Sequence, residues 1–271
     1  MDNDDAPIGR LLSRREALVV LAGGAGAALI TAACGSDDTA SPTATTGSSP
    51  TGAAATAGAD ATPAATLAAM PLCIVRPALT EGPYFVDERL HRADIRANTS
   101  DGAVRDGVPL ALTFNVSEAG ANACTPLAGA QVDIWHCDAL GVYSDVSDPN
   151  FNTKGQDFLR GYQVTDADGR AQFTTIYPGW YQGRAVHIHF KIRNADAAGR
   201  HYEFTSQVFF EDALSQQVYA SNAPYSEKGT AFLRNAQDGI YQQSQGQLVL
   251  AAQPSGNGYS AAFDIGLQLT S

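Results

Sequence analysis

Hydrophobic and polar residues alternate along much of the chain after Met70. Leu110, Leu112, Phe114 and Val116 recur at every second position. Successive side chains of a β-strand point to opposite faces, so a period of two predicts a strand with one buried face. Similar runs predict strands over residues 132–137, 158–165, 170–176, 186–192 and 204–210.

Two kinds of segment interrupt the strands. The run Asp166-Ala167-Asp168-Gly169 is a strong turn signal and predicts a hairpin between the strands on either side of it. Only residues 213–220 and, more weakly, 227–235 favour helix. Short strands joined by Gly and Asp turns predict a mainly β fold, an antiparallel β-sandwich with few short helices.

The first 34 residues resemble an export signal. Ser13-Arg14-Arg15 precedes the apolar stretch Ala17–Ala33, which is short for a membrane span of about 20 residues and is typical of a twin-arginine signal. Thr31-Ala32-Ala33-Cys34 resembles a lipoprotein cleavage box. We expect an exported protein, either a cell-surface lipoprotein with lipid on Cys34 or a secreted one. Simple cleavage and an uncleaved anchor remain alternatives.

Residues 35–69 consist mainly of Ala, Thr, Ser, Pro, Gly and Asp. Such a segment has little apolar surface to bury, so we expect a flexible linker. Residues 70–271 then form one folded domain. A net charge of -11 argues against nucleic acid or an anionic membrane surface as the main partner, which leaves only a lipid anchor or the signal as a membrane contact.

The four cysteines are Cys34, Cys73, Cys124 and Cys137. A lipid on Cys34 leaves three thiols in an oxidising compartment, so at least one stays unpaired. Cys124 and Cys137 flank a turn-like stretch and a strand, and we expect a disulfide between them. No C-x-x-C pair occurs, so metal binding by cysteine is not expected.

The strongest chemical signal is a pair of histidines in the segment 186–192. Because they are two positions apart on a predicted strand, His187 and His189 share one face, with backbones about 7 Å apart. Two such imidazoles can converge on one metal ion, or they can lie on a solvated face. The preceding turn, residues 178–184, offers no acid but contains Tyr181 and Arg184.

Several segments together resemble the intradiol ring-cleavage dioxygenases, which include protocatechuate 3,4-dioxygenase and catechol 1,2-dioxygenase. In chain order they are Thr80-Glu81-Gly82-Pro83-Tyr84, residues 132–136, Gly141-Val142-Tyr143-Ser144, Arg160-Gly161, the Asp166–Gly169 turn, Pro178-Gly179-Trp180-Tyr181, residues 184–190 and residues 205–210. The resemblance runs from about Cys73 to Phe210 and implies that residues 70–271 are the catalytic domain.

The resemblance implies that Fe(III) is the cofactor. The family's four iron ligands fall on Tyr143, Tyr181, His187 and His189. Phenolate is a hard anionic donor that favours ferric iron, and coordination lowers the pKa of a tyrosine far below about 10. Neutral imidazoles complete a site with room for hydroxide or substrate.

The same resemblance implies the reaction, which is cleavage of a catechol-type ring between its two hydroxyl-bearing carbons. Both atoms of O2 would enter the product, a muconate-type diacid, in aromatic catabolism. Tyr181 would leave the metal when the catechol binds and would act as an internal base. Arg184 would stabilise developing negative charge, and Tyr84, Arg184 and Gln207 would contact the substrate.

The chain also departs from the family's better-known members. Only two residues separate Tyr181 from Arg184, Val186 replaces a small residue, and the signal and linker stand where catechol 1,2-dioxygenases carry a helical segment. These departures resemble the secreted branch of the family and leave the individual catechol and the oligomeric state open. Two alternatives remain: a non-catalytic transthyretin-like binding module, and a ferrous or copper oxygenase.

Overall fold

The computed structural model describes residues 73–120, 123–195 and 201–269. The predicted export signal (1–34), the lipid site at Cys34 and the linker (35–69) lie outside these residues and stay predictions. No helix in the described ranges is long and apolar enough to cross a membrane.

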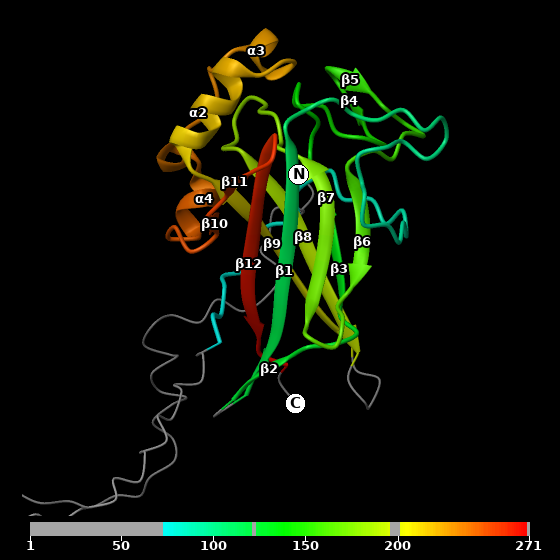
Figure 1. The fold of residues 1–271 in the computed structure, drawn as a ribbon, viewed down its shortest axis with the longest axis vertical. Helices are drawn as coiled ribbons and strands as arrows, with labels where there is room; N and C mark the ends of the chain where they lie inside the picture. Colours follow the sequence, from blue (N-terminus) through cyan, green and yellow to red (C-terminus); the bar gives the residue numbers. More distant parts are fainter. Residues whose placement is uncertain (1–72, 121–122, 196–200, 270–271) are drawn as a thin grey trace, which may run out of the picture. The chain divides into compact units, whose positions relative to one another are not determined.

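Two five-stranded sheets dominate the described part of the chain (Figure 1). The first contains β11 (Gln253–Ser255), β12 (Gly258–Leu267), β1 (Pro109–Ala119) and β2 (Cys124–Pro126) in that order, with β7 (Arg170–Ile176) also paired to β1. The second has the order β10 (Val249–Leu250), β9 (His201–Phe210), β8 (His187–Ala195), β3 (Gln131–Trp135) and β6 (Arg160–Val164). A separate hairpin pairs β4 (Ser147–Asp148) with β5 (Phe151–Asn152).

The sandwich core forms where the alternating faces of the two sheets meet. Leu110, Leu112, Phe114 and Val116 of β1 are each at most 1% exposed, as their period of two predicts. Phe114 packs on Phe190 of β8 with ring centroids 5.1 Å apart, which ties one sheet to the other. Burying a side chain of this size contributes about 1.5–3 kcal/mol. The mainly β prediction is therefore confirmed.

The antiparallel prediction holds for most strand pairs but not for all. β12 runs parallel to β1, with Phe263 beside Phe114, and β10 runs parallel to β9. The turn at Asp166–Gly169 is formed, but the predicted hairpin is wrong. β6 pairs with β3 in one sheet and β7 with β1 in the other, so the turn carries the chain between the sheets.

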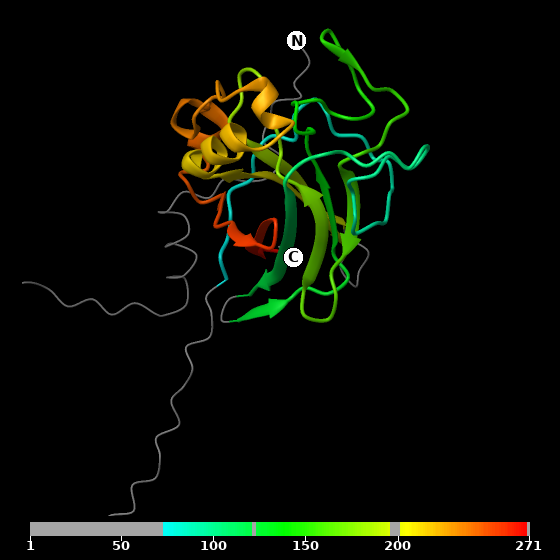
Figure 2. The same ribbon diagram turned by 45° about the horizontal axis from the view of Figure 1, so that its top comes forward.

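Three short helices and a 3-10 turn follow β9 and lie together in the ribbon views (Figures 1 and 2). α2 (Asp212–Ser221) confirms the helix predicted over 213–220. The helix predicted over 227–235 is wrong: α3 (Tyr225–Lys228) ends at Gly229, whose φ of 80° is left-handed. The chain then continues into η1 (Asn235–Gln237) and α4 (Gly239–Gln243).

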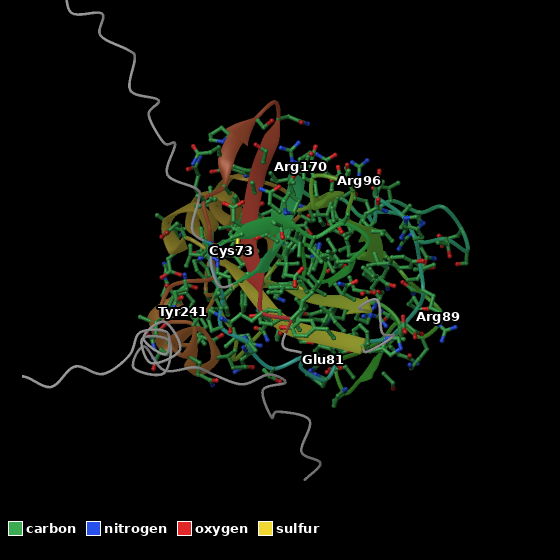
Figure 3. All side chains as sticks on the ribbon, turned by 90° about the horizontal axis from the view of Figure 1, so that it is seen from below. Cys73, Glu81, Arg89, Arg96, Arg170 and Tyr241 are labelled. Carbon is green, nitrogen blue, oxygen red and sulfur yellow. A yellow bond between two sulfur atoms is a disulfide. The ribbon has the colours of Figure 1, made fainter. Side chains whose placement is uncertain are left out.

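The predicted Cys124–Cys137 disulfide is wrong. Cys124 pairs with Cys73, with Cα atoms 5.2 Å apart; Cys73 is labelled in Figure 3. Cys124 lies on β2, at the edge of the first sheet, whereas Cys137 follows β3 in the second sheet. Cys137 is buried and is the free cysteine of the described residues, with its thiol 3.5 Å from the carbonyl oxygen of Gly179.

Candidate active site

β8 places His187 and His189 on the same face, as their spacing predicts, and both are at most 2% exposed. Their Nε2 atoms lie 3.0 Å apart. In the β-ladder His189 lies between Trp135 of β3 and Gln207 of β9. The Trp135 ring stacks on the His189 ring with centroids 5.0 Å apart, which fixes the orientation of this imidazole.

Both imidazoles are neutral at physiological pH. Burial, followed by the charge of Arg184, lowers the pKa of His187 to about 3. Burial and the neighbouring His187 hold the pKa of His189 well below its usual value. The Nδ1 atom of His187 lies 2.6 Å from the carbonyl oxygen of Ala185 and must donate to it, so Nε2 carries no proton and can act as an acceptor or a metal ligand.

Two phenols complete the group. The hydroxyls of Tyr143 and Tyr181 lie 3.5 Å and 3.2 Å from Nε2 of His187. Tyr143 is 1% exposed, whereas Tyr181 stands in a turn before β8 and is half-buried. Burial is the largest cause that raises the pKa of both tyrosines, so each is a neutral phenol unless a cation stabilises its phenolate.

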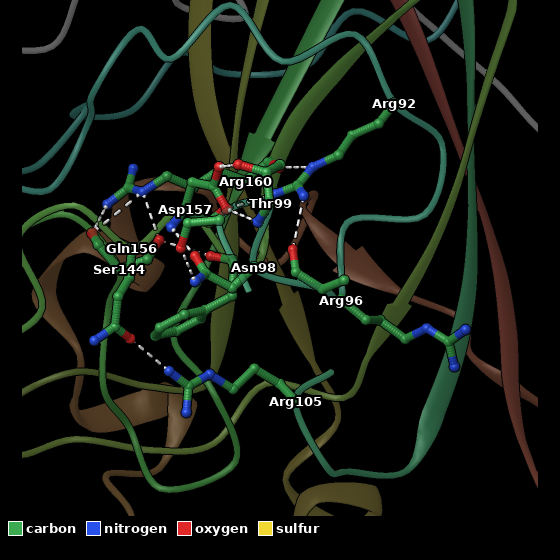
Figure 4. Close-up of polar contacts among 12 residues, drawn as sticks. Arg92, Arg96, Asn98, Thr99, Arg105, Ser144, Gln156, Asp157 and Arg160 are labelled. Atoms are coloured by element: carbon green, nitrogen blue, oxygen red, sulfur yellow. Dashed lines mark hydrogen bonds and ion pairs between the residues drawn. The ribbon is translucent and has the colours of Figure 1, made fainter. Parts of the chain in front are cut away.

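The backbone at Tyr143 is clamped from both sides. Thr153 donates its hydroxyl to the carbonyl oxygen of Tyr143 at 2.6 Å. The buried Arg160 donates to the carbonyl oxygen of Ser144 at 2.6 Å and to its hydroxyl at 2.9 Å, a contact visible in Figure 4. These bonds explain how a loop residue keeps one position against β8.

Residues 79–87, here called the strap, cross the outer face of the second sheet over the histidines. The Leu79 amide donates to the carbonyl oxygen of Thr205 at 3.1 Å. Gly82 has a φ of 74°, and a Cβ on it would lie 3.1 Å from Cε1 of His189. The strap therefore touches the imidazole where only glycine fits.

Tyr84 brings an aromatic ring from the strap to the site. Its ring centroid lies 4.6 Å from that of Tyr143. Its hydroxyl donates to Asp148 of β4 at 2.7 Å, and burial together with this bond raises the pKa of Tyr84 to about 12. Tyr84 thus stands beside the four-residue group, and its role as a substrate contact stays a prediction.

Arg184 and Gln207 also lie at the site. Nη2 of Arg184 donates to Oε1 of Gln207 at 2.6 Å, and Nε2 of Gln207 donates to the carbonyl oxygen of Thr80 in the strap at 2.9 Å. Gln207 is fully buried and is the β9 partner of His189. The register thus places the guanidinium next to the histidine pair.

Asp238 belongs to the site and was missed by sequence reasoning. Its Oδ2 accepts from Nε of Arg184 at 2.9 Å. Burial would raise the pKa of Asp238, but the charge of Arg184 and hydrogen bonds from the Ala185 and Tyr241 amides outweigh it, so the pKa is lowered and the carboxylate is ionised. No local pattern in the sequence points to Asp238, because its partner Arg184 lies 54 positions away along the chain.

The donor set fits a ferric ion. Among the residues that the structure describes, no three His, Cys, Asp or Glu side chains group in a way that could hold a metal ion. The two tyrosine hydroxyls are the side-chain oxygens that lie beside the histidine pair and could complete a metal site there. Metal–nitrogen distances are about 2 Å, so two nitrogens 3.0 Å apart can reach one ion. Two phenols, which can bind as hard anionic phenolates, and two neutral imidazoles form a donor set suited to Fe(III).

Comparison with known protein families identifies the family to which this chain belongs. Residues 80–228 match the Dioxygenase family. The chain belongs to the intradiol ring-cleavage dioxygenases. An intradiol ring-cleavage dioxygenase from Tetranychus urticae has a similar structure, with a TM-score of 0.61 and 31% identity over 72% of this chain and 95% of that chain.

Curated relatives of this dioxygenase family include ring-cleaving enzymes. A catechol 1,2-dioxygenase of Candida albicans is 29% identical over 128 residues, 40% of this chain and 36% of that protein. A chlorocatechol 1,2-dioxygenase of a Pseudomonas species is 30% identical over 155 residues, 50% of this chain and 55% of that protein. The chain therefore spans about half or less of the length of these two relatives.

Proposed function

We propose that this protein uses Fe(III) and O2 to cleave catechol-type rings between the two hydroxyl-bearing carbons, giving muconate-type diacids in aromatic catabolism. One observation carries the proposal: in a member of the intradiol family, the second imidazole and two phenol hydroxyls lie within 3.5 Å of Nε2 of His187. The names of the curated relatives support a catechol-type substrate.

Tyr143, Tyr181, His187 and His189 would hold the iron. When bound, ferric iron would supply Lewis acidity, which would make the catechol ring more reactive toward O2. The lone pair of His187 already faces inward, because its other nitrogen donates to the Ala185 carbonyl. The Trp135 ring stacks on the His189 ring and holds that imidazole in its orientation by packing.

Tyr181 is the residue suited to take a proton from the substrate. It stands in a turn and is half-buried, whereas Tyr143 is buried and clamped through its carbonyl. A tyrosine in a turn can move aside when a catechol enters, and its phenolate oxygen then accepts a catechol proton. Tyr143 stays in place as a permanent donor.

Arg184 supplies positive charge where the ring becomes electron-rich. Its guanidinium contacts Gln207, the strand neighbour of His189. A fixed cation in a site shielded from water stabilises developing negative charge strongly. Tyr84, packed on Tyr143, offers an apolar face for the substrate ring.

Product analysis tests this proposal. The iron-loaded protein is incubated with catechol under ¹⁸O2, and the product is identified by mass spectrometry. A muconate-type diacid carrying two ¹⁸O atoms is expected. A ring-opened aldehyde acid would contradict cleavage between the hydroxyl-bearing carbons. Unchanged catechol would favour the alternative of a non-catalytic binding module. That alternative gives no reason for the convergence of two tyrosines and two histidines.

A further inference from the structure

The Arg184 guanidinium is fixed from two directions. On one side Nη2 donates to Gln207 at 2.6 Å, and on the other Nε donates to Oδ2 of Asp238 at 2.9 Å. Gln207 belongs to the sheet that carries His187 and His189, whereas Asp238 lies between η1 and α4. Two separate parts of the fold therefore set where the positive charge lies.

Each oxygen of Asp238 has its own pair of donors. Oδ2 accepts from Arg184 Nε and from the Ala185 amide, the latter at 2.7 Å. Oδ1 accepts from the amides of Ile240 and Tyr241 at 2.7 and 3.1 Å, as the N-cap of α4. The carboxylate is 2% exposed. The Asp238 side chain thus links the first turn of α4 to Ala185, which lies just before β8 and His187.

The segment that carries Asp238 is itself anchored to β9. Nδ2 of Asn235 donates to the carbonyl oxygen of Phe210 at 2.8 Å, and the Asn235 amide donates to Asp212 at 3.1 Å. This segment follows residues 80–228, the part that matches the family. Asp238, one of the two partners of Arg184, therefore lies outside the part of the chain that matches the family.

We propose that Asp238 is a positioning residue that holds the Arg184 guanidinium beside the substrate ring. The proposal rests on the function given above, in which Arg184 stabilises charge on that ring. An unpaired arginine samples many rotamers, whereas this one is held at two of its nitrogens. Misplacing a catalytic group by about 1 Å can cost about 10²-fold in rate.

Asp238→Asn separates the two roles of this side chain. Asparagine is as good an N-cap as aspartate, so its oxygen can keep the bonds to Ile240 and Tyr241. Its amide group would then present N–H donors to the N–H groups of Arg184 and Ala185, and the anchor is lost. Gln242→Ala is the matched control, because it removes an exposed hydrogen bond within the same segment, from Nε2 of Gln242 to the Ala236 carbonyl oxygen, and leaves the Asp238 carboxylate and its four donors in place.

Steady-state kinetics give the first test. We expect Asp238→Asn to lower kcat about 10- to 100-fold, with a smaller change in KM, while Gln242→Ala keeps wild-type kcat. If Asp238 acts only through Arg184, the double variant with Arg184→Leu is no slower than Arg184→Leu alone. The proposal would be overturned if the loss of kcat in the double variant equalled the product of the losses in the two single variants. Wild-type kcat in Asp238→Asn would also overturn it.

A nuclear magnetic resonance measurement on the iron-free full chain tests positioning without any turnover. The ¹⁵Nε–¹H signal of Arg184, identified by its absence in Arg184→Lys, should be shifted by the carboxylate and protected from exchange with water. Protection should survive in Gln242→Ala and disappear in Asp238→Asn. Unchanged protection in Asp238→Asn would overturn the proposal. If even the wild-type protein failed to open catechols, the proposed function would fall, and the resonance would still decide whether Asp238 holds Arg184.

Discussion

At the scale of single residues, exclusion of water sets the chemistry of the site. Burial makes His187 and His189 neutral and keeps Tyr143 protonated until a cation is present. Such a site binds a metal ion by releasing phenolic protons, so iron affinity should rise with pH. The same burial makes the site sensitive to added atoms.

Gly82→Ala should disturb His189. The new Cβ would lie 3.1 Å from the imidazole, at a backbone φ of 74° that costs a residue other than glycine about 1–2 kcal/mol. Gly102→Ala is the control, because Gly102 has a φ of 71° and open space around its Cβ position. Iron titration should show weaker binding for Gly82→Ala alone, while both variants lose similar stability. Equal iron affinity in the two variants would contradict the contact.

Tyr181→Phe should separate the roles of the two tyrosines. If Tyr181 is the base, its phenylalanine variant keeps most bound iron and loses turnover by roughly 10² to 10⁴. Tyr143→Phe should instead weaken iron binding, because the buried permanent donor is lost. Iron content and kcat, measured on both variants, check this. Wild-type turnover in Tyr181→Phe would show that the base lies elsewhere.

Sequence reasoning reached these residues by two routes. The period of two placed His187 and His189 on one face from local geometry alone. Tyr143 and Tyr181 came only from the resemblance, because a tyrosine in a loop carries no local sign of what it faces. Asp238 escaped both routes, since its contact with Arg184 depends on how the helical segment packs against β9.

At the scale of elements, six of the strands were predicted from the sequence, whereas β12 and the pairing of the strands were missed. Ala261, Phe263, Ile265 and Leu267 alternate as buried residues, so β12 carries the same sequence signal as β1. Its parallel pairing with β1 is long-range and leaves no local trace. The Cys73–Cys124 bridge was missed for the same reason: Cys73 approaches the first sheet beside Gly266, far along the chain.

Loss of the bridge should destabilise the fold. The double variant Cys73→Ser/Cys124→Ser frees a loop closed across 51 positions, and we expect its free energy of unfolding to fall by about 2–4 kcal/mol. Denaturant unfolding of oxidised protein measures this. A reductant should lower the stability of the wild type and leave the variant unchanged. Reductant sensitivity in the variant would point to another bridge.

At the scale of the whole molecule, a buried histidine connects the two sheets. His136 is fully buried after β3, and its Nδ1 donates to the Cys137 carbonyl oxygen at 2.8 Å. Its Nε2 therefore accepts from the Thr175 hydroxyl of β7 at 2.7 Å. Burial lowers the pKa of His136 to about 4. The sandwich thus holds this histidine neutral.

Acid should weaken the sandwich through His136. Between pH 6.5 and 4 the unfolded chain binds a proton that the folded protein does not, so stability falls as pH falls. From pH 7 to pH 5 the wild type should lose about 2 kcal/mol more than His136→Gln, whose side chain does not titrate. Denaturant unfolding at the two pH values checks this. Equal losses in the two proteins would show that His136 is not the group responsible.

The central claim is that two tyrosines and two histidines together hold ferric iron, and the visible absorption spectrum of the purified, Fe(III)-loaded protein tests it most directly. Phenolate bound to ferric iron absorbs visible light, so a red-brown protein with one iron per chain is expected. The band should change in Tyr143→Phe and vanish with the iron in His187→Ala. A wild-type protein that holds one ferric ion without visible absorption would contradict the account, because its tyrosines would not be ligands.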